Sequence, residues 1–488
     1  MKPLDDIRGA DRHRVNLLTA HVSRPSWHPA DTRALILITV FAGVIRMAAL
    51  GTPAGIVFDE SYYAQDACWY LTRSEALCTH RGEASRMHPP LGKWLTAAGI
   101  RLFGYTPFGW RAAAWAAGTL SIALLYLLAR RLLRSTTGAA IASGLLAVDF
   151  LHFIHSRIAM LDIFVTAFGL AAFLFAVYDH DSTASELRRP WRLAAGIAAG
   201  AAVASKWSGL SLLAGVIALT LWWATHPVGG RPRGWTPGGL LVSIGLPLVV
   251  APVLVYAAAH IGRVGGHVFA PPWDPASWWY AFLQRQWFAL RFHTGTFPQH
   301  PYQSPAWSWL LLRRPVLYFF AESGREVREI LALGNPLVWW SSLPALGAAA
   351  VHWIRRRGDA ETVILVGFAA AYLPWLLFDR LRTFVFLFYL LPAIPFLCLA
   401  LARAAVAAPG RLWGRAAAVG FGAATVVLLL FFYPLLTARP LSAEAWAARV
   451  RVFANCGSPG PGGSGQMGTL RRPPPVRPGP PPRGWCWI

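Results

Sequence analysis

Two adjacent carboxylates, Asp59 and Glu60, stand in the stretch "GIVFDESYYAQDACWYL", directly after the first long apolar run of the chain. A carboxylate can take a proton from a hydroxyl group and so act as a general base. Ionisable groups at membrane depth are costly, and by default they indicate function. The alternative is a solvated loop charge, and for either residue alone the two interpretations have equal weight.

Several cations in other polar stretches could hold a phosphate group, and they are His88, Lys93, Arg157, Lys206 and Arg382. Only three of the 45 Lys and Arg residues are lysines, which draws attention to Lys93 and Lys206. Lys93 follows "HPPLG", where two prolines lead into a predicted helix, and a helix N-terminus favours anions. A lysine that extends from a helix end to the membrane interface explains Lys93 equally well.

The elements that must position these residues are predicted to be membrane helices. Of the 488 residues, 55% are hydrophobic and 14% are charged, whereas soluble domains carry about a quarter charged residues. Apolar runs of membrane-crossing length recur along the chain. We therefore expect an all-α polytopic membrane protein with about eleven transmembrane helices, near residues 34–50, 111–128, 138–153, 159–178, 193–205, 208–225, 238–259, 337–354, 362–378, 384–402 and 416–436.

The connections between these runs alternate in arginine content along the chain. One set of connections is arginine-rich, and the positive-inside rule places it in the cytoplasm together with the N-terminus. The other set holds residues 51–110, "FIHSRIAMLD", "SKWSGL", residues 260–336 and "FDRLRTF". All the candidate residues then share the non-cytoplasmic face. Five chance loop charges become a weaker explanation than one polar site.

The predicted organisation has three parts. A cytoplasmic N-terminal segment, 1–33, precedes a transmembrane domain, 34–440, with outer loops 51–110 and 260–336. No cleavable signal peptide is apparent, because about thirty mostly polar residues come before the first apolar run. An extracytoplasmic tail, 441–488, becomes rich in Gly, Pro and Arg after Ala454 and is expected to be largely disordered. An altered reading frame or a lineage-specific tail would explain it.

The predicted location of the site restricts its chemistry. Nucleotide sugars and ATP are not available outside the cytoplasmic membrane, and the chain has no phosphate-cradling GxxxxGK[ST] loop. A polyprenyl-phosphate sugar arrives in the membrane and carries its own phosphate leaving group. Such a reaction needs a base for the acceptor hydroxyl and cations for the phosphate.

Two other ligand classes are disfavoured. The net charge of +23 is scattered in small groups, so we expect no nucleic-acid partner. Glu60, His88 and His293 are weak metal candidates, because no ligand spacing such as HxxxH is present. We expect no divalent metal and no cofactor beyond a lipid-linked sugar donor.

Six stretches carry a family resemblance: "FDESYYAQDA", "HPPLGKWL", "HSRIAMLDIF", "SKWSGL", "HPYQSPAWSWLLLRRPV" and "RTFVFLFYLLPAIPF". In this order they resemble the bacterial polyprenol-phosphate-mannose–protein mannosyltransferases, the actinobacterial relatives of the eukaryotic protein O-mannosyltransferases. The resemblance covers about residues 35 to 440. Each motif alone is weak, but six in family order are specific.

The resemblance implies a GT-C glycosyltransferase fold and an inverting transfer of mannose from polyprenyl-phosphate-mannose to Ser or Thr hydroxyls of secreted proteins, at the translocon on the outer face of the cell membrane. It maps the family's acidic pair onto Asp59, the base, and Glu60. From its motifs we also assign substrate-binding roles to Asp162, Trp207, His300 and Tyr302. The 260–336 loop is too short for the MIR domain of the eukaryotic members.

Two alternatives remain. A GT-C enzyme could use the same donor but transfer the sugar to a lipid or a cell-wall glycan. A transporter would typically show internal repeats and broken helices at the midplane. This chain shows no repeat, and its polar motifs cluster at one membrane face.

The sequence leaves open whether two of the cysteines are joined by a disulfide or lie unbridged on one continuous helix. Cys68 and Cys78 both lie in the first outer loop, where an oxidising compartment lets a disulfide persist. A continuous helix from Ser61 to Leu77 would hold their Cα atoms about 15 Å apart, beyond the roughly 7 Å that a disulfide spans.

Overall fold

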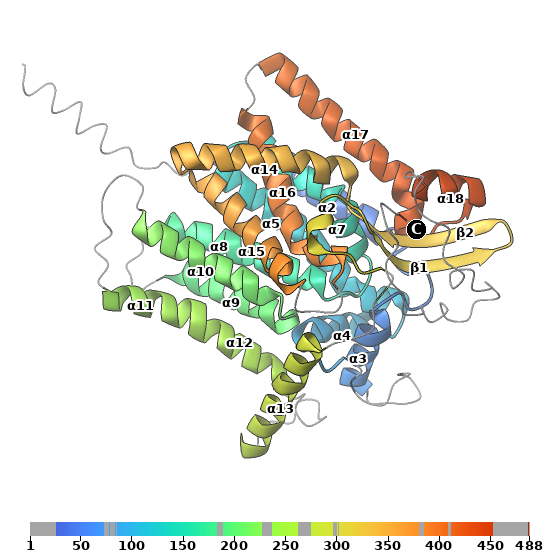
Figure 1. Cartoon of the computed structure of the whole chain (residues 1–488), viewed down its shortest axis with the longest axis horizontal. Helices are drawn as coiled ribbons and strands as arrows, with labels where there is room; N and C mark the ends of the chain where they lie inside the picture. Colours follow the sequence, from blue (N-terminus) through green and yellow to red (C-terminus); the bar gives the residue numbers. More distant parts are fainter. Residues whose placement is uncertain are drawn as a thin grey trace, which may run out of the picture.

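The computed structural model describes most of the chain as a helical bundle with a cluster of shorter elements at one end (Figure 1). The described residues are 26–72, 78, 83, 85–182, 189–226, 237–261, 275–295, 300, 302–379, 385–407, 411–451 and 487. The helices α3 (Glu60–Thr72), α4 (Leu91–Phe103) and α13 (Pro275–Thr294) lie at that end together with a β-hairpin.

Each predicted apolar run coincides with a helix or with consecutive helical pieces. The bundle consists of α2 (Pro29–Met47), α5 (Pro107–Leu133), α6 (Thr136–Ala147), α7 (Phe150–His155), α8 (Asp162–His180), α9 (Pro190–Ser205), α10 (Gly209–Thr225), α11 (Pro237–Gly245), η1 (Leu246–Val250), α12 (Ala251–His260), α14 (Pro336–Arg356), α15 (Asp359–Phe378), η4 (Leu387–Ala393), α16 (Ile394–Ala407) and α17 (Arg411–Thr437).

The protein is a multi-span membrane protein, and its predominantly helical fold class is confirmed. Seven helical stretches within the described residues are long and apolar enough to cross a membrane, and α6 and α10 are shorter apolar helices. The total of eleven spans stays a prediction. The third run is divided because Asp149 accepts a hydrogen bond from the backbone N–H of His152 and caps α7.

Buried ion pairs join helix ends in the arginine-rich set of connections. Arg130 at the end of α5 binds Asp31 at the start of α2, with Nε and Oδ1 2.7 Å apart. Arg192 in α9 contacts Asp179 in α8 in the same way, at 2.7 Å. These arginines were predicted as cytoplasmic loop charges. Instead they are buried and paired, because an unpaired charge in a low-dielectric interior is unstable.

The outer loops contain regular structure that the apolar runs did not reveal. The second loop holds α13, η3 (Ala306–Ser308) and the antiparallel hairpin of β1 (Val316–Ser323) and β2 (Glu326–Ala332). A third short strand, β3 (Leu441–Ser442), pairs with β2 and leads into α18 (Ala443–Val450). Gly324 has a φ of +61° and supplies the left-handed backbone that the hairpin turn requires.

The predicted C-terminal tail therefore begins with ordered structure at residues 441–451. Trp487 is also described, and its indole N–H donates to the carbonyl of Leu312 at 2.7 Å. The predicted disorder concerns residues that lie outside the described ones. The same holds for most of the predicted N-terminal segment 1–33, of which residues 26–33 are described and Pro29 begins α2.

The two cysteines of the first outer loop form a disulfide. Cys68 and Cys78 are bonded, and their Cα atoms are 5.8 Å apart. The continuous helix from Ser61 to Leu77 that was considered from the sequence is wrong, because α3 ends at Thr72, before Cys78. The bridge links Cys68 in α3, the helix that begins at Glu60, to Cys78.

Non-reducing peptide mapping should therefore recover one linked peptide that contains Cys68 and Cys78. Because Cys398 is buried within α16 and has no disulfide partner, it should be recovered as a free thiol after denaturation in alkylating reagent. Closing a loop of this size is worth about 3 kcal/mol in the chain-entropy model, so Cys68→Ser should lower the apparent melting temperature. Alkylation of both loop cysteines in the unreduced protein would contradict the assignment.

Candidate active site

Asp59 lies at the start of α3, where its carboxylate is half-buried. Phe58, with a φ of +48°, turns the chain into the helix. The hydroxyl of Tyr63, one turn later, donates to Oδ2 of Asp59 at 3.4 Å. Desolvation raises the pKa of Asp59 to about 6, against the opposing effect of the Lys206 charge. A partly accessible carboxylate with this pKa is deprotonated near neutral pH and basic enough to accept a proton.

Glu60 is the adjacent residue, but its surroundings differ completely. It is fully buried and forms a bidentate ion pair with Arg111 of α5, with nitrogen–oxygen distances of 2.8 and 2.9 Å. Its oxygens also accept hydrogen bonds from the backbone N–H groups of Val57 and Ala159. With all these partners, Glu60 holds the loop and helix in place. Sequence reasoning had grouped it with Asp59 as catalytic.

Lys206 and Asp162 form a second ion pair close to Asp59. The Nζ of Lys206 lies 2.8 and 2.9 Å from the two carboxylate oxygens of Asp162. Lys206 follows the last residue of α9 in extended conformation, and Asp162 is the first residue of α8. Both charges act on Asp59, Lys206 lowering its pKa and Asp162 raising it. The structure thus brings together three residues predicted from three separate motifs.

Aromatic rings surround this pair of acids and the lysine. The Nζ of Lys206 lies 4.6 Å from the ring centre of Tyr389 and 5.8 Å from that of Phe388. Tyr318 of β1 stacks on Phe58 at 4.4 Å, and its hydroxyl is 2.9 Å from Nε2 of His155. Rings on several sides reduce the hydration of the charges they contact, and this strengthens electrostatic interactions at the site.

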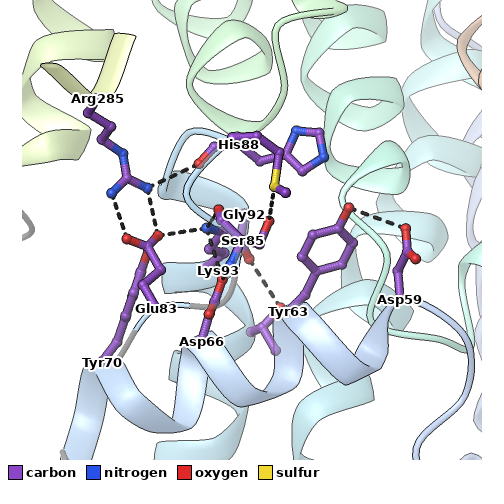
Figure 2. A network of polar contacts seen from close by, with 12 residues as sticks. Asp59, Tyr63, Asp66, Tyr70, Glu83, Ser85, His88, Gly92, Lys93 and Arg285 are labelled. Carbon is purple, nitrogen blue, oxygen red and sulfur yellow. Dashed lines mark hydrogen bonds and ion pairs between the residues drawn. The ribbon is translucent and has the colours of Figure 1, made fainter. Parts of the chain in front are cut away.

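Lys93 belongs to a closed network beside the site, which Figure 2 shows. It is fully buried, and its Nζ lies 3.0 Å from Asp66 of α3 and 2.7 Å from Glu83. Glu83 also accepts two hydrogen bonds from Arg285 of α13, at 2.5 and 2.6 Å, and one from the hydroxyl of Tyr70 at 2.5 Å.

The electrostatics of this network follow from the two cations. Burial alone would raise the pKa of Glu83, but Lys93 and Arg285 overcome this effect and hold it well below its usual range. The predicted phosphate-binding role of Lys93 is corrected, because its charge is already neutralised by two carboxylates. Snorkelling is excluded too, since Lys93 has no exposed surface.

Arg157 is corrected for a similar reason. Its guanidinium donates to the carbonyl oxygens of Arg46, in the last turn of α2, and of Ala48 and Ala49, which follow that turn. The carbonyls of Arg46 and Ala48 are among those that a helix end leaves without an intrahelical partner, and the carbonyl of Ala49 also accepts from the backbone N–H of Thr52. Arg157 therefore caps α2 and is not placed to bind a donor phosphate.

His88 and Trp207 both contact the ring of His293 near the site. The His88 ring lies 5.8 Å from that of Tyr63 and 5.5 Å from that of His293 in α13. Trp207 lies 5.6 Å from the same His293 ring, and its indole N–H donates to the hydroxyl of Tyr256 at 2.9 Å. The rings of both predicted residues thus belong to one group of aromatic side chains that includes His293 and Tyr63.

His300 and Tyr302 lie together in a separate group. The backbone N–H of Tyr302 donates to Nδ1 of His300 at 3.2 Å, and Arg314 lies over the Tyr302 ring at 5.1 Å. The His300 ring is 5.0 Å from Phe386, which stacks on Phe388 beside Lys206. Their substrate-binding role stays a prediction. Arg382 lies outside the described residues.

Among the described residues, no group of three or more His, Cys, Asp or Glu side chains is arranged to hold a metal ion. His88 and His293 face each other's rings, while Glu60 is engaged by Arg111. The expectation that the reaction needs no divalent metal therefore stays a prediction.

Sequence reasoning missed Tyr63, Arg111 and Tyr318 as site residues. Tyr63 had a usable signal, because it stands four residues after Asp59 on the same helical face. Arg111 also had one, as an arginine at the start of an apolar run. Tyr318 had no local signal, since it reaches the site through the hairpin.

Comparisons of the structure identify the fold. The chain superposes on the Saccharomyces cerevisiae protein O-mannosyltransferase Pmt1–Pmt2 complex bound to the sugar donor, with a TM-score of 0.71 and 17% identity, over 87% of this chain and 92% of the other. It also matches ArnT from Cupriavidus metallidurans bound to undecaprenyl phosphate, with a TM-score of 0.53 and 18% identity, over 83% and 74% of the two chains. The protein has the GT-C fold.

Sequence comparisons then define the family. Residues 36–261 match the dolichyl-phosphate-mannose-protein mannosyltransferase family, and residues 278–452 match the C-terminal four-transmembrane region of protein O-mannosyltransferases. A polyprenol-phosphate-mannose–protein mannosyltransferase of Mycobacterium tuberculosis is 31% identical over 84% of this chain and 89% of its own length. The chain belongs to the protein O-mannosyltransferase family and is a membrane-bound glycosyltransferase.

The Glu60–Arg111 pair should dominate the stability of the first loop. Glu60→Gln leaves the Arg111 charge buried without a counter-ion, and breaking a buried pair in this way costs about 3–5 kcal/mol. The neighbouring Asp59→Asn, at a half-buried position without an ion-pair partner within contact distance, is the matched control and should change the melting temperature little. Removing both charges, in Glu60→Gln with Arg111→Met, should recover part of the loss. Equal melting temperatures for Glu60→Gln and Asp59→Asn would contradict this role.

Glu83 should matter more for stability than Arg285, because it neutralises two cations. Glu83→Gln leaves Lys93 and Arg285 sharing only Asp66, whereas Arg285→Gln leaves Lys93 and Glu83 paired. We therefore expect a larger fall in melting temperature for Glu83→Gln, and faster hydrogen exchange in α13, whose connection to α3 and α4 runs through this carboxylate. The opposite ranking of the two variants would show that the network does not centre on Glu83.

Proposed function

We propose that this protein transfers mannose from a polyprenyl-phosphate-mannose donor to Ser or Thr hydroxyls of secreted proteins, on the outer face of the cytoplasmic membrane. The proposal combines the family with the geometry around Asp59. The relative in Mycobacterium tuberculosis is named for this donor and for a protein acceptor, and the superposed yeast complex is described as bound to the sugar donor.

The observation that carries the proposal is the half-buried carboxylate of Asp59, next to the Lys206–Asp162 pair. In the proposed reaction Asp59 removes the proton from the acceptor hydroxyl. The hydroxyl oxygen then bonds to C1 of mannose as the bond from C1 to the phosphate oxygen breaks. The phosphate leaves with the bonding electrons, and attack from the opposite side inverts the anomeric carbon. The proton on Asp59 finally passes to solvent.

Lys206 is proposed to attract the donor phosphate. An ammonium group has three N–H donors, and the two oxygens of Asp162 engage it at 2.8 and 2.9 Å from one side. A phosphate that approaches from the side of Asp59 can accept the remaining donor. Arg382 stays a predicted second cation. No metal is needed in this scheme, since phosphate is already a good leaving group and a lysine offsets its charge.

The assignment of the site to the outer face is supported by the way its elements are grouped. The start of α3 meets β1 through the stacked rings of Phe58 and Tyr318, and the end of α9 meets the start of α8 through the Lys206–Asp162 pair. The elements α3, α4 and the hairpin lie at the same end of the bundle (Figure 1). The buried pairs Arg130–Asp31 and Arg192–Asp179 join helix ends of the arginine-rich parity, which the positive-inside rule assigns to the cytoplasm.

The function is tested with the full-length protein in lipid nanodiscs, polyprenyl-phosphate-mannose as donor, and two acceptors in parallel. One acceptor is a Ser/Thr/Pro-rich peptide, and the other is a mannose-containing cell-wall glycan fragment. Mannosylation of the peptide, located on a Ser or Thr by mass spectrometry, is the expected result. Transfer to the glycan alone would replace the protein acceptor by a glycan and leave the donor chemistry intact.

Asp59→Asn should remove turnover while preserving the fold, because the amide has nearly the same shape but cannot accept the proton. Loss of general-base assistance typically reduces kcat about 10²- to 10⁴-fold. The donor KM should change much less than kcat. Wild-type turnover in the folded Asp59→Asn protein would show that another group is the base.

Lys206→Ala should raise the donor KM about 10- to 100-fold, the effect expected for one lost charge-assisted hydrogen bond. The peptide KM should change little. Lys206→Arg keeps the cation and is the matched control, with a smaller rise in donor KM. A donor KM in Lys206→Ala that equals the wild-type value would remove Lys206 from the phosphate site.

A further inference from the structure

The outer-loop sheet has a long edge strand, β1. Its strand order is β1–β2–β3, so β1 lies at the edge. The far side of β2 pairs with β3 through Val327 with Leu441 and Glu326 with Ser442. In the part of the chain that the structure describes, no strand pairs with the far side of β1. An edge strand of this kind is a ready template for another extended chain.

The register defines which backbone groups face the open edge. The two-residue turn at Gly324 and Arg325 closes on the pair Ser323–Glu326, which is the hydrogen-bonded type in such hairpins. The alternate pairs, Glu322–Val327 and Phe320–Glu329, are then the non-hydrogen-bonded type. The N–H and C=O groups of Phe320 and Glu322 therefore point away from β2.

Neither Phe320 nor Glu322 has a backbone hydrogen-bond partner on the open side among the described residues. Phe320 is half-buried against Trp446 of α18, with ring centres 6.0 Å apart, while Glu322 is exposed. The edge thus offers two N–H donors and two carbonyl acceptors at the spacing of an extended strand.

The other end of β1 lies beside Phe58, the residue that precedes Asp59. Tyr318 is the extra residue at an irregularity in the β1–β2 register, and its ring stacks on Phe58, the residue before Asp59. Bulges next to active sites commonly redirect a side chain. Burial raises the pKa of Tyr318 well above its usual value, and the charges of Asp162 and Asp59 add to this effect.

We propose that the acceptor polypeptide binds in extended conformation along the open edge of β1, hydrogen-bonded to the backbone of Phe320 and Glu322, with its reactive Ser or Thr beyond Tyr318 at Asp59. The inference rests on the proposed function and adds a binding mode to it. An extended peptide supplies alternating N–H and C=O groups that match the edge. A sugar or a lipid chain offers no such ladder.

In this binding mode, hydrogen bonds to β1 alternate along the acceptor peptide. Successive residues of a strand direct their backbone groups to opposite edges, so only every second acceptor residue bonds to β1. The intervening residues face away from it. The edge can therefore accept many sequences while it requires an extended backbone.

The test is a series of synthetic acceptor peptides with one Thr, each N-methylated at a single backbone position, assayed with the full-length enzyme in nanodiscs. Removing one hydrogen bond should raise the peptide KM about 3- to 10-fold. We expect this rise at alternate positions, with the intervening positions as built-in controls. Glu322→Pro removes the outward N–H and places the proline ring at the edge. It should raise the peptide KM at least 3-fold above that of Glu322→Ala, which loses only the side chain, at an unchanged donor KM.

The outcomes separate this inference from the proposed function. If the unmethylated peptide is mannosylated but N-methylation has no alternating effect, the inference is wrong and the function stands. A Glu322→Pro variant with altered oligomeric state and unchanged peptide KM would mean that the edge pairs two copies, which also overturns it. Failure of the wild-type enzyme to mannosylate any peptide would remove the proposed function and the inference together. If Glu322→Pro does not fold, the N-methylation series alone decides.

Discussion

The ion pair between Glu60 and Arg111 is the contact on which the rest of the site depends. It joins the start of α3 to the first long span, α5, and Arg111 also donates to the carbonyls of Leu50, Pro53 and Gly55. The loop that leads from α2 to Asp59 is thus held by one guanidinium. Because both charges are fully buried, neither can be lost alone without a large penalty. The buried pair fixes the backbone at Glu60, and this holds the half-buried carboxylate of the neighbouring Asp59 in position.

A second constraint is that the lysines described near Asp59 are also paired with carboxylates. Lys206 faces Asp162, and Lys93 with Arg285 faces Glu83 and Asp66. The two groups differ in access. The Lys93 network is closed around its own carboxylates, as Figure 2 shows, whereas Lys206 lies among the aromatic rings next to Asp59. This difference separates a cation that supports the structure from one that is placed to meet a phosphate.

Much of this arrangement could be predicted from the sequence. The apolar runs predicted the helices, and their parity predicted that Asp59, Asp162 and Lys206 share one face. The roles of individual charges could not be predicted, because they depend on partners that are distant in the sequence. Glu83, the partner of Lys93, also binds Arg285, which lies about 200 residues further along the chain. Asp59 and Glu60 are adjacent in sequence, but successive residues at a helix start point in different directions, so one faces the site and the other Arg111. The disulfide could not be predicted, because it depended on where α3 ends. The apolar run of the hairpin, Val316 to Ala321, is too short for periodicity alone to identify it as a strand.

The central claim, that Asp59 is the base and that its surroundings set its basicity, is tested most directly by the pH dependence of kcat/KM for mannosyl transfer. Only the carboxylate form of Asp59 can accept the proton, so activity should rise with pH and level off above an apparent pKa of about 6. Because Lys206 lowers this pKa, Lys206→Met should move the rise to higher pH. A wild-type profile that is flat between about pH 5 and 8, or a rise that persists unchanged in the residual activity of Asp59→Asn, would contradict the assignment.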